Sequence, residues 1–191
     1  MKKIAVFASG SGSNFQSIVD EIEAGRLEAK ISLLVCDNPG AYVIDRAKKA
    51  GIQCFVFNPK EYRLKADYER EIAFELKSYG VDFVVLAGYM RLIGSTLLED
   101  YEGRMVNIHP SLLPDFPGKD AIGQALAAKV DESGVTIHYV DNGMDTGPII
   151  AQKKVKLDQN ETRESLEKKI HIVEHWLYPS ILQLLFTQGG N

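Results

Sequence analysis

Two polar side chains stand where a buried strand should end. Residues 104–109 read RMVNIH, and Pro110 follows them. Side chains in a strand alternate between its faces, so Asn107 and His109 share one face. An amide and a charged imidazole both donate hydrogen bonds to a developing oxyanion, and the imidazole can also transfer a proton. A histidine satisfied by a backbone carbonyl is the plainer interpretation, but Asn107 two residues earlier favours the catalytic one.

An acidic loop could supply a carboxylate to this pair. Residues 141–148 read DNGMDTGP, which is rich in turn-forming residues. A carboxylate beside His109 would favour the charged imidazole. The residue types do not decide between Asp141 and Asp145, and a solvated hairpin loop is the plainer alternative.

A glycine turn near the start could bind an anion. Residues 9–14 read SGSGSN, between an apolar strand pattern and a helical one. Glycine permits a tight turn and a close approach to a ligand, and amides at a helix N-terminus attract negative charge. Because no Lys-Ser or Lys-Thr pair follows, the turn is not a Walker A loop.

Two further interpretations of this turn stay open. Gly10 and Gly12 fit the dinucleotide fingerprint, but Phe15 stands at its third glycine position. Asp37, after the second strand pattern, could then bind a ribose, as in a nicotinamide-dependent oxidoreductase. Alternatively, the turn only joins two elements, and Ser13 or Asn14 caps the helix. The turn suits a monophosphate better than a dinucleotide.

The elements that must position these residues alternate along the chain. Apolar strand patterns occur at 3–9, 31–37, 53–58, 82–88 and 104–109, and helical patterns lie at 14–23, 41–51 and 66–80. This βα repetition predicts an α/β protein with a doubly wound, mostly parallel, Rossmann-like sheet. Strand patterns at 134–141 and 147–157 predict a late antiparallel hairpin at one side of the sheet. A C-terminal helix should begin near Thr162 and be disturbed at Pro179.

Pro110 ends the polar strand, so Asn107 and His109 lie at its carboxyl end. Open α/β sheets bind their ligands in a crevice at the carboxyl ends of the parallel strands. Asn107 and His109 should therefore point into that crevice. Residues 1–191 contain neither a linker nor a repeat, so a single catalytic domain is expected.

Composition narrows the class of protein. The chain has 191 residues, 45% hydrophobic, and a net charge of −4. Without a basic tract, a nucleic-acid partner is not expected. No segment approaches the roughly 20 apolar residues of a membrane helix, and the first apolar run is too short for a signal peptide. Two cysteines in apolar stretches suit a reducing cytoplasm.

Four segments, in order along almost the whole chain, resemble the phosphoribosylglycinamide formyltransferases of purine biosynthesis. They are SGSGSN at 9–14, LAGYMR at 86–91, NIHPSLLP at 107–114 and MDTGP at 144–148. The resemblance implies formyl transfer from 10-formyltetrahydrofolate to the amine of glycinamide ribonucleotide (GAR). It implies small-molecule substrates and no metal, and a homodimer is left open.

The resemblance also implies roles for individual residues. His109 is expected to be the catalytic acid and Asn107 its partner at the oxyanion, with Asp145 as the carboxylate that favours charged His109. The substrate phosphate and ribose are assigned to Gly12, Ser13, Asn14 and Glu174. The folate site is assigned to Lys65, Met90, Arg91, Leu92, Ile93, Asn107, Asp141, Asn142, Gly143, Met144 and Asp145.

One of these assignments has support from the helical pattern itself. Ile170, Val173 and Leu177 form an apolar stripe on the C-terminal helix, and Glu174 lies beside it. A carboxylate close to a buried stripe needs a partner, unless it sits at the edge of the stripe and faces water.

The chain departs from some relatives in two places. Lys65 stands where they carry an arginine that contacts the folate, and the two side chains are not equivalent at bidentate sites. The sequence PGKDAIGQAL at 117–126 lacks their histidine-rich stretch. His171 and His175 are four residues apart on a helix, but no third ligand accompanies them, so no metal site is expected.

Four rival functions remain. Methionyl-tRNA formyltransferases share the Asn-x-His-Pro element but carry a further C-terminal domain. Formyltetrahydrofolate deformylases share it with water as the acceptor, and carry an added N-terminal domain. A nicotinamide-dependent oxidoreductase would use the glycine turn and Asp37, while a phosphometabolite sensor would not need Asn107 and His109.

Overall fold

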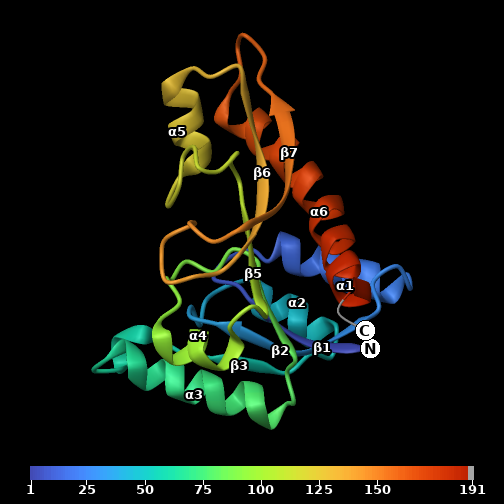
Figure 1. The fold of residues 1–191 in the computed structure, drawn as a ribbon, viewed down its shortest axis with the longest axis vertical. Helices are drawn as coiled ribbons and strands as arrows, with labels where there is room; N and C mark the ends of the chain where they lie inside the picture. The colour runs from blue at the N-terminus through green and yellow to red at the C-terminus, as the bar shows by residue number, and fades with distance from the viewer. Residues whose placement is uncertain (189–191) are drawn as a thin grey trace.

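A seven-stranded sheet forms the centre of the protein, seen in a computed structural model that describes residues 1–188 (Figure 1). The strands lie in the order β3-β2-β1-β4-β5-β6-β7. The first five along the chain pair in parallel, and β6 and β7 pair antiparallel. The doubly wound sheet and the hairpin at its side are confirmed. The strands are β1 (Lys2–Phe7), β2 (Ala29–Cys36), β3 (Cys54–Val56), β4 (Phe83–Leu86), β5 (Met105–His109), β6 (Glu132–Tyr139) and β7 (Ile149–Lys156).

The four expected helices form, and two short ones join them. The helices are α1 (Ser13–Glu23), α2 (Val43–Lys49), α3 (Lys65–Ser78), α4 (Ser95–Tyr101), α5 (Ala121–Ala128) and α6 (Arg163–Gln188), with a 3₁₀ turn η1 (Pro59–Glu61). The sequence patterns did not predict α4 and α5. Seven or eight residues give too few turns for a clear helical period.

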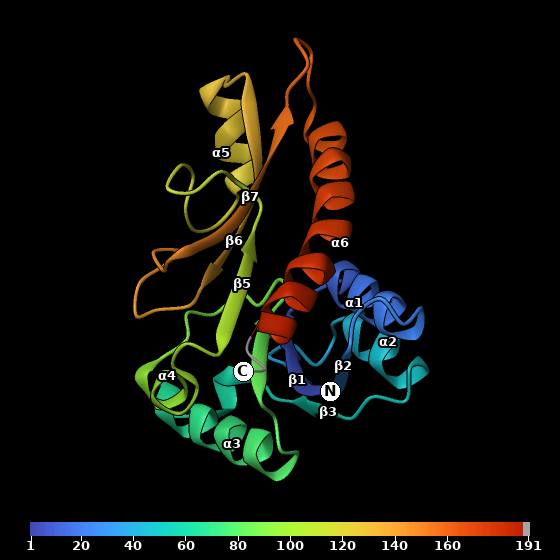
Figure 2. The same cartoon turned by 45° about the vertical axis from the view of Figure 1, so that its right-hand side comes forward.

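The helices cover both faces of the sheet (Figure 2). Helices α1, α2 and α6 pack on one face, around Ile4, Val6 and Val106. Helices α3 and α4 pack on the other, around Phe7 and Met105. The two faces of β5 therefore enter different cores, as the alternation predicts. This arrangement leaves the carboxyl ends of the strands free to form a site.

Helix α6 runs along the sheet (Figure 1). Hydrogen bonds from this helix join it to two strands, β4 and β5. The helix continues through Pro179, which lies inside it and is buried, so the proline does not end the helix. Tyr178, fully buried, donates its hydroxyl to the carbonyls of Leu86 and Val106, at 2.8 and 3.2 Å. Packing against the sheet holds this segment helical despite the proline.

The structure also shows the state of the two cysteines and the hydropathy of the helices. Cys36 is buried and Cys54 half-buried, and both carry free thiols. Within residues 1–188, no helix combines the length and the hydropathy of a membrane span.

Candidate active site

A cavity of about 600 Å³ opens at the carboxyl ends of β1, β4 and β5. Most residues named from the sequence line it together. They are Gly12, Ser13, Asn14, Met90, Arg91, Leu92, Ile93, Asn107, His109, Asp141, Gly143, Met144, Asp145 and Glu174. The cavity is large enough for a small-molecule ligand and lies where this sheet topology predicts one.

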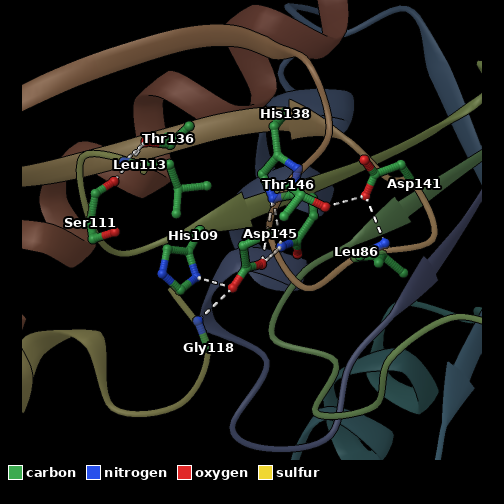
Figure 3. A network of polar contacts seen from close by, with 12 residues as sticks. Leu86, His109, Ser111, Leu113, Gly118, Thr136, His138, Asp141, Asp145 and Thr146 are labelled. Carbon is green, nitrogen blue, oxygen red and sulfur yellow. Dashed lines mark hydrogen bonds and ion pairs between the residues drawn. The ribbon is translucent and has the colours of Figure 1, made fainter. Parts of the chain in front are cut away.

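Asp145 lies at the centre of a polar cluster (Figure 3). One carboxylate oxygen, Oδ2, accepts the Gly118 amide at 2.7 Å and lies 3.5 Å from His109 Nδ1. The other ring nitrogen of His109, Nε2, is 2.8 Å from the carbonyl of Phe116. Both nitrogens of His109 thus face oxygen acceptors, and only an imidazole protonated on both can donate to each.

The choice between the two acids of the loop is now clear. Asp141 accepts hydrogen bonds from Gly143 and Thr146 of its own loop, at 3.0 and 2.7 Å. Asp145 has a left-handed backbone, with φ of 57°, which aims its side chain at His109 instead. Asp145 is therefore the carboxylate that can assist the imidazole.

Opposing effects set the pKa of Asp145. Burial raises it, while the hydrogen bond with His138, the Gly118 amide and the charge of His109 lower it. The lowering effects win, and the pKa of this carboxyl falls below its ordinary value of 3.8. Asp145 is accordingly a carboxylate at neutral pH, despite being largely buried.

His138 belongs to the cluster, and the sequence analysis missed it. It is buried on β6, directly opposite Asn107 on β5. Its Nε2 lies 3.2 Å from Asn107 Nδ2 and 3.6 Å from Asp145 Oδ1. A histidine inside a strand pattern was the available signal, but the pairing of β5 with β6 cannot be read from local sequence.

The Asn107 amide nitrogen already has two neighbours in this cluster. It lies 3.2 Å from His138 and 3.4 Å from Asp145 Oδ1. Donation to an oxyanion would require one of these contacts to be exchanged for the ligand. Both contacts are long, so the exchange costs little.

The glycine turn presents unpaired amides to the cavity. Gly12 is the N-cap of α1, with φ of 74° and no side-chain cap, so capping by Ser13 or Asn14 is wrong. Among residues 1–188 the amides of residues 11–15 have no acceptor in the protein. A side chain at Gly12 would put Cβ 2.4 Å from Val43 Cγ2. The turn is therefore a helix N-terminus that can receive an anion.

Glu174 closes this side of the cavity from α6. It is 5% exposed, so the alternative in which it faces water is wrong. Its Oε2 accepts a hydrogen bond from Asn14 Nδ2 at 3.0 Å, which provides the partner that the sequence demanded. The side-chain oxygen of Asn14, Oδ1, is buried and has no hydrogen-bond partner among residues 1–188, as expected of an atom that binds a ligand.

This pair makes a pH-dependent contribution to stability. Burial raises the pKa of Glu174 above its ordinary value of 4.5, opposed by the Asn14 hydrogen bond. A raised pKa means that Glu174 favours folding below about pH 4.5 and loses this contribution as the pH rises. We expect Glu174→Gln to be more stable than the wild type at pH 8, by a margin that shrinks towards pH 4.

Thermal unfolding of both proteins across this range measures the margin. Glu164→Gln is the matched control, because Glu164 lies on the same helix and its side chain is 79% exposed. A margin for Glu174→Gln that is the same at both pH values would contradict the prediction.

The opposite wall of the cavity includes residues 90–93. Ser9 Oγ accepts the Met90 amide at 2.9 Å, which joins this wall to the glycine turn. Arg91 donates from Nε to Asp37 Oδ2 at 2.7 Å. Asp37 is thus paired with Arg91 and does not line the cavity. Its proposed role as a ribose-binding acid is wrong for this structure.

Two residues assigned to the folate site do not reach the cavity. Lys65 is exposed at the start of α3, with its Nζ 3.7 Å from Glu69 Oε1. Asn142 lies in the acidic loop, but its neighbours line the cavity and it does not. Sequence position alone could not separate these residues from their neighbours.

Besides His138, three further basic side chains at the cavity were not predicted, namely Lys119, Arg163 and His171. Arg163 pairs with Asp120 at 2.6 Å. His171 stacks on His175 with ring centroids 5.9 Å apart. In the part of the chain that the structure describes, no three His, Cys, Asp or Glu side chains are grouped as metal ligands.

Comparison with known proteins identifies the family of the chain. The family model described as formyl transferase matches residues 2–182. The chain belongs to the formyl transferase family.

Two relatives match it over nearly their whole length, and a third matches it over a small part of its length. The phosphoribosylglycinamide formyltransferase of Bacillus subtilis (strain 168) is 54% identical, over 97% of this chain and 95% of that protein. The crystal structure of glycinamide ribonucleotide transformylase 1 from Geobacillus kaustophilus has a TM-score of 0.95 and 62% identity, covering 97% and 98%. The human trifunctional purine biosynthetic protein adenosine-3 is 35% identical, and the match covers 96% of this chain but 18% of that protein.

Proposed function

We propose that this formyltransferase carries a formyl group from 10-formyltetrahydrofolate to the amine of GAR, in purine biosynthesis. The observation that carries the proposal is the Asn107–His109–Asp145 cluster. It lies in one cavity, between the glycine turn, which can receive an anion, and the apolar side chains of the opposite wall. The names and the near-complete coverage of the relatives from Bacillus subtilis and Geobacillus kaustophilus support the choice of substrates.

The acceptor binds at the glycine turn. The free amides at Gly12, Ser13 and Asn14 receive its phosphate, because they lie at the N-terminus of α1. Glu174 and the unpaired oxygen of Asn14 are close enough to this turn to bind the ribose. The acceptor amine then points towards His109.

The donor binds on the wall formed by residues 90–93 and 141–145. Met90, Leu92 and Met144 are 66, 45 and 54% exposed and line the cavity. Exposed apolar side chains around a cavity favour a flat ring system such as a pterin. Arg91, held by Asp37, remains available to a carboxylate of the glutamate tail.

The reaction follows from these groups. The amine nitrogen attacks the formyl carbon, a new carbon–nitrogen bond forms, and the oxygen becomes negatively charged. Asn107 and protonated His109 stabilise that oxygen, each exchanging one of its contacts within the protein for the ligand, with Asp145 balancing the imidazolium. The bond to the folate nitrogen breaks, and the proton that the amine loses passes to that nitrogen. No metal takes part, and Asp145 can order the water that relays the proton.

A turnover assay tests the proposal. The loss of the formyl group from a 10-formyl folate is followed by ultraviolet absorbance, with and without GAR. Turnover that requires GAR supports the proposal. Turnover without GAR would mean a deformylase that transfers formyl to water, and absence of turnover in both would reject formyl transfer from this donor.

A substitution at the glycine turn tests the acceptor site. Gly12→Ala strains a left-handed backbone, which costs about 1–2 kcal/mol, and crowds Val43. We expect the KM for GAR to rise about tenfold or more, with the KM for the donor unchanged. Gly25→Ala is the matched control, since Gly25 has a φ of +72° but open space around it. Equal effects on both KM values would argue against phosphate binding at this turn.

Three wider assignments belong to the same proposal. Residues 1–191 act as a single catalytic domain. The protein works in the cytoplasm. Its partners are small-molecule substrates, and it binds neither nucleic acid nor a membrane. A homodimer is compatible with this function. Size-exclusion chromatography with light scattering distinguishes the monomer from the dimer.

A further inference from the structure

The loop from Gly88 to Gly94, called here the 88–94 loop, is held from three directions. Ser9 accepts its Met90 amide, and Asp37 accepts from its Arg91 side chain. The third contact comes from the far side of the sheet. Glu69 Oε1, on α3, accepts the Gly94 amide at 2.7 Å.

Glu69 is buried, which is unusual for an acidic side chain. It is 2% exposed and does not line the cavity, so it contacts neither proposed substrate. Burial raises the pKa of this carboxyl, opposed by the Gly94 amide and by Lys65. A buried carboxylate is costly unless hydrogen bonds compensate it, so the contact with Gly94 is a substantial part of what stabilises Glu69 there.

The fit between the two residues is close. A Cβ atom at Gly94 would lie 2.5 Å from Glu69 Oε2 and 3.0 Å from Oε1. Only a residue without a side chain lets the backbone approach the carboxylate in this way. Gly94 follows Ile93, which is buried and lines the cavity, so movement at Gly94 is transmitted to the wall.

We propose that Glu69 is a positioning residue for the formyl donor. By anchoring Gly94 from outside the cavity, it sets the position of residues 91–93 against the donor, whereas it makes no direct contact with the acceptor site on the other side of the cavity. The donor assignment of this wall rests on the proposed function.

Kinetics of Glu69 variants test this role. Glu69→Ala removes the acceptor for the Gly94 amide, and we expect the donor KM to rise about tenfold. The GAR KM and kcat should stay within about threefold. Glu69→Gln keeps an oxygen that can accept the amide, and should restore the donor KM to within about threefold. Glu75→Ala is the control, since Glu75 is on the same helix and its side chain has no hydrogen bond or ion pair among residues 1–188.

A double-mutant cycle isolates the contact itself. Gly94→Ala alone should raise the donor KM, because its Cβ meets the carboxylate. In the Glu69→Ala background the same change should have a smaller effect, because the carboxylate is gone. Additive effects of the two changes would overturn the proposal.

Hydrogen exchange separates this proposal from the proposed function. In the protein without substrates, Glu69→Ala should speed amide exchange in the 88–94 loop, while exchange in residues 11–15 stays unchanged. Unchanged exchange in the loop, or equal rises in both KM values, would overturn the positioning role. If the wild type does not use the folate donor at all, the proposed function fails, and faster exchange confined to the loop would still support the anchoring by Glu69.

Discussion

His109→Ala should lower kcat by about 10²–10⁴-fold while both KM values stay within about threefold. The reason is that His109 supplies both a charged hydrogen bond to the oxyanion and a transferable proton, and the cavity offers no second imidazole in the same position. His138, the nearest other histidine of the cluster, lies on β6 opposite Asn107, with its Nδ1 2.8 Å from the carbonyl of Tyr139. Steady-state kinetics with the folate donor and GAR measure the effect.

The control for this prediction is His175→Ala. His175 lies on α6 outside the cavity lining, so its removal should leave kcat within about threefold. Both variants should also show cooperative thermal unfolding. A loss of less than tenfold for His109→Ala in a folded protein would remove His109 from the chemistry.

Asp145→Asn should fold normally and lose about 10²-fold or more in kcat near neutral pH. Asparagine tolerates the left-handed backbone of this position, where φ is 57°. It also keeps an oxygen for the Gly118 amide. What it loses is the negative charge 3.5 Å from His109 Nδ1, which balances the imidazolium.

Asp141→Asn is the matched comparison, because the two acids lie in one loop and line one cavity. Asp141 bonds to its own loop and not to His109, so we expect its substitution to lower kcat by less than about tenfold. Similar losses for the two variants would mean that charge in the loop, and not contact with His109, matters for the rate.

The lowered pKa of Asp145 also predicts a difference in stability between the wild type and Asp145→Asn. A carboxyl with a lowered pKa stabilises the folded state above its ordinary value of 3.8, and the contribution is lost as the pH falls through the lowered pKa. Urea unfolding should therefore show the wild type more stable than Asp145→Asn at pH 7, with a smaller difference at pH 3. A difference that does not shrink in acid would show that the charge of Asp145 does not stabilise the fold.

Local patterns in the sequence were sufficient for much of this structure. Alternation along residues 104–109 and the stop at Pro110 placed Asn107 and His109 on one face at a strand end, since these are properties of neighbouring residues. The βα repetition, which predicted the sheet, is also a local pattern. So is the apolar stripe of α6, whose position beside Glu174 predicted a partner for this carboxylate.

Contacts between distant segments were decided only by the tertiary structure. The register of β5 against β6 places His138 opposite Asn107, and the left-handed backbone of Asp145 selects it over Asp141. Packing of α3 under the 88–94 loop brings Glu69 to Gly94, 25 residues along the chain. These pairings depend on how whole elements pack, and no periodicity of neighbouring residues encodes which partner each side chain will meet.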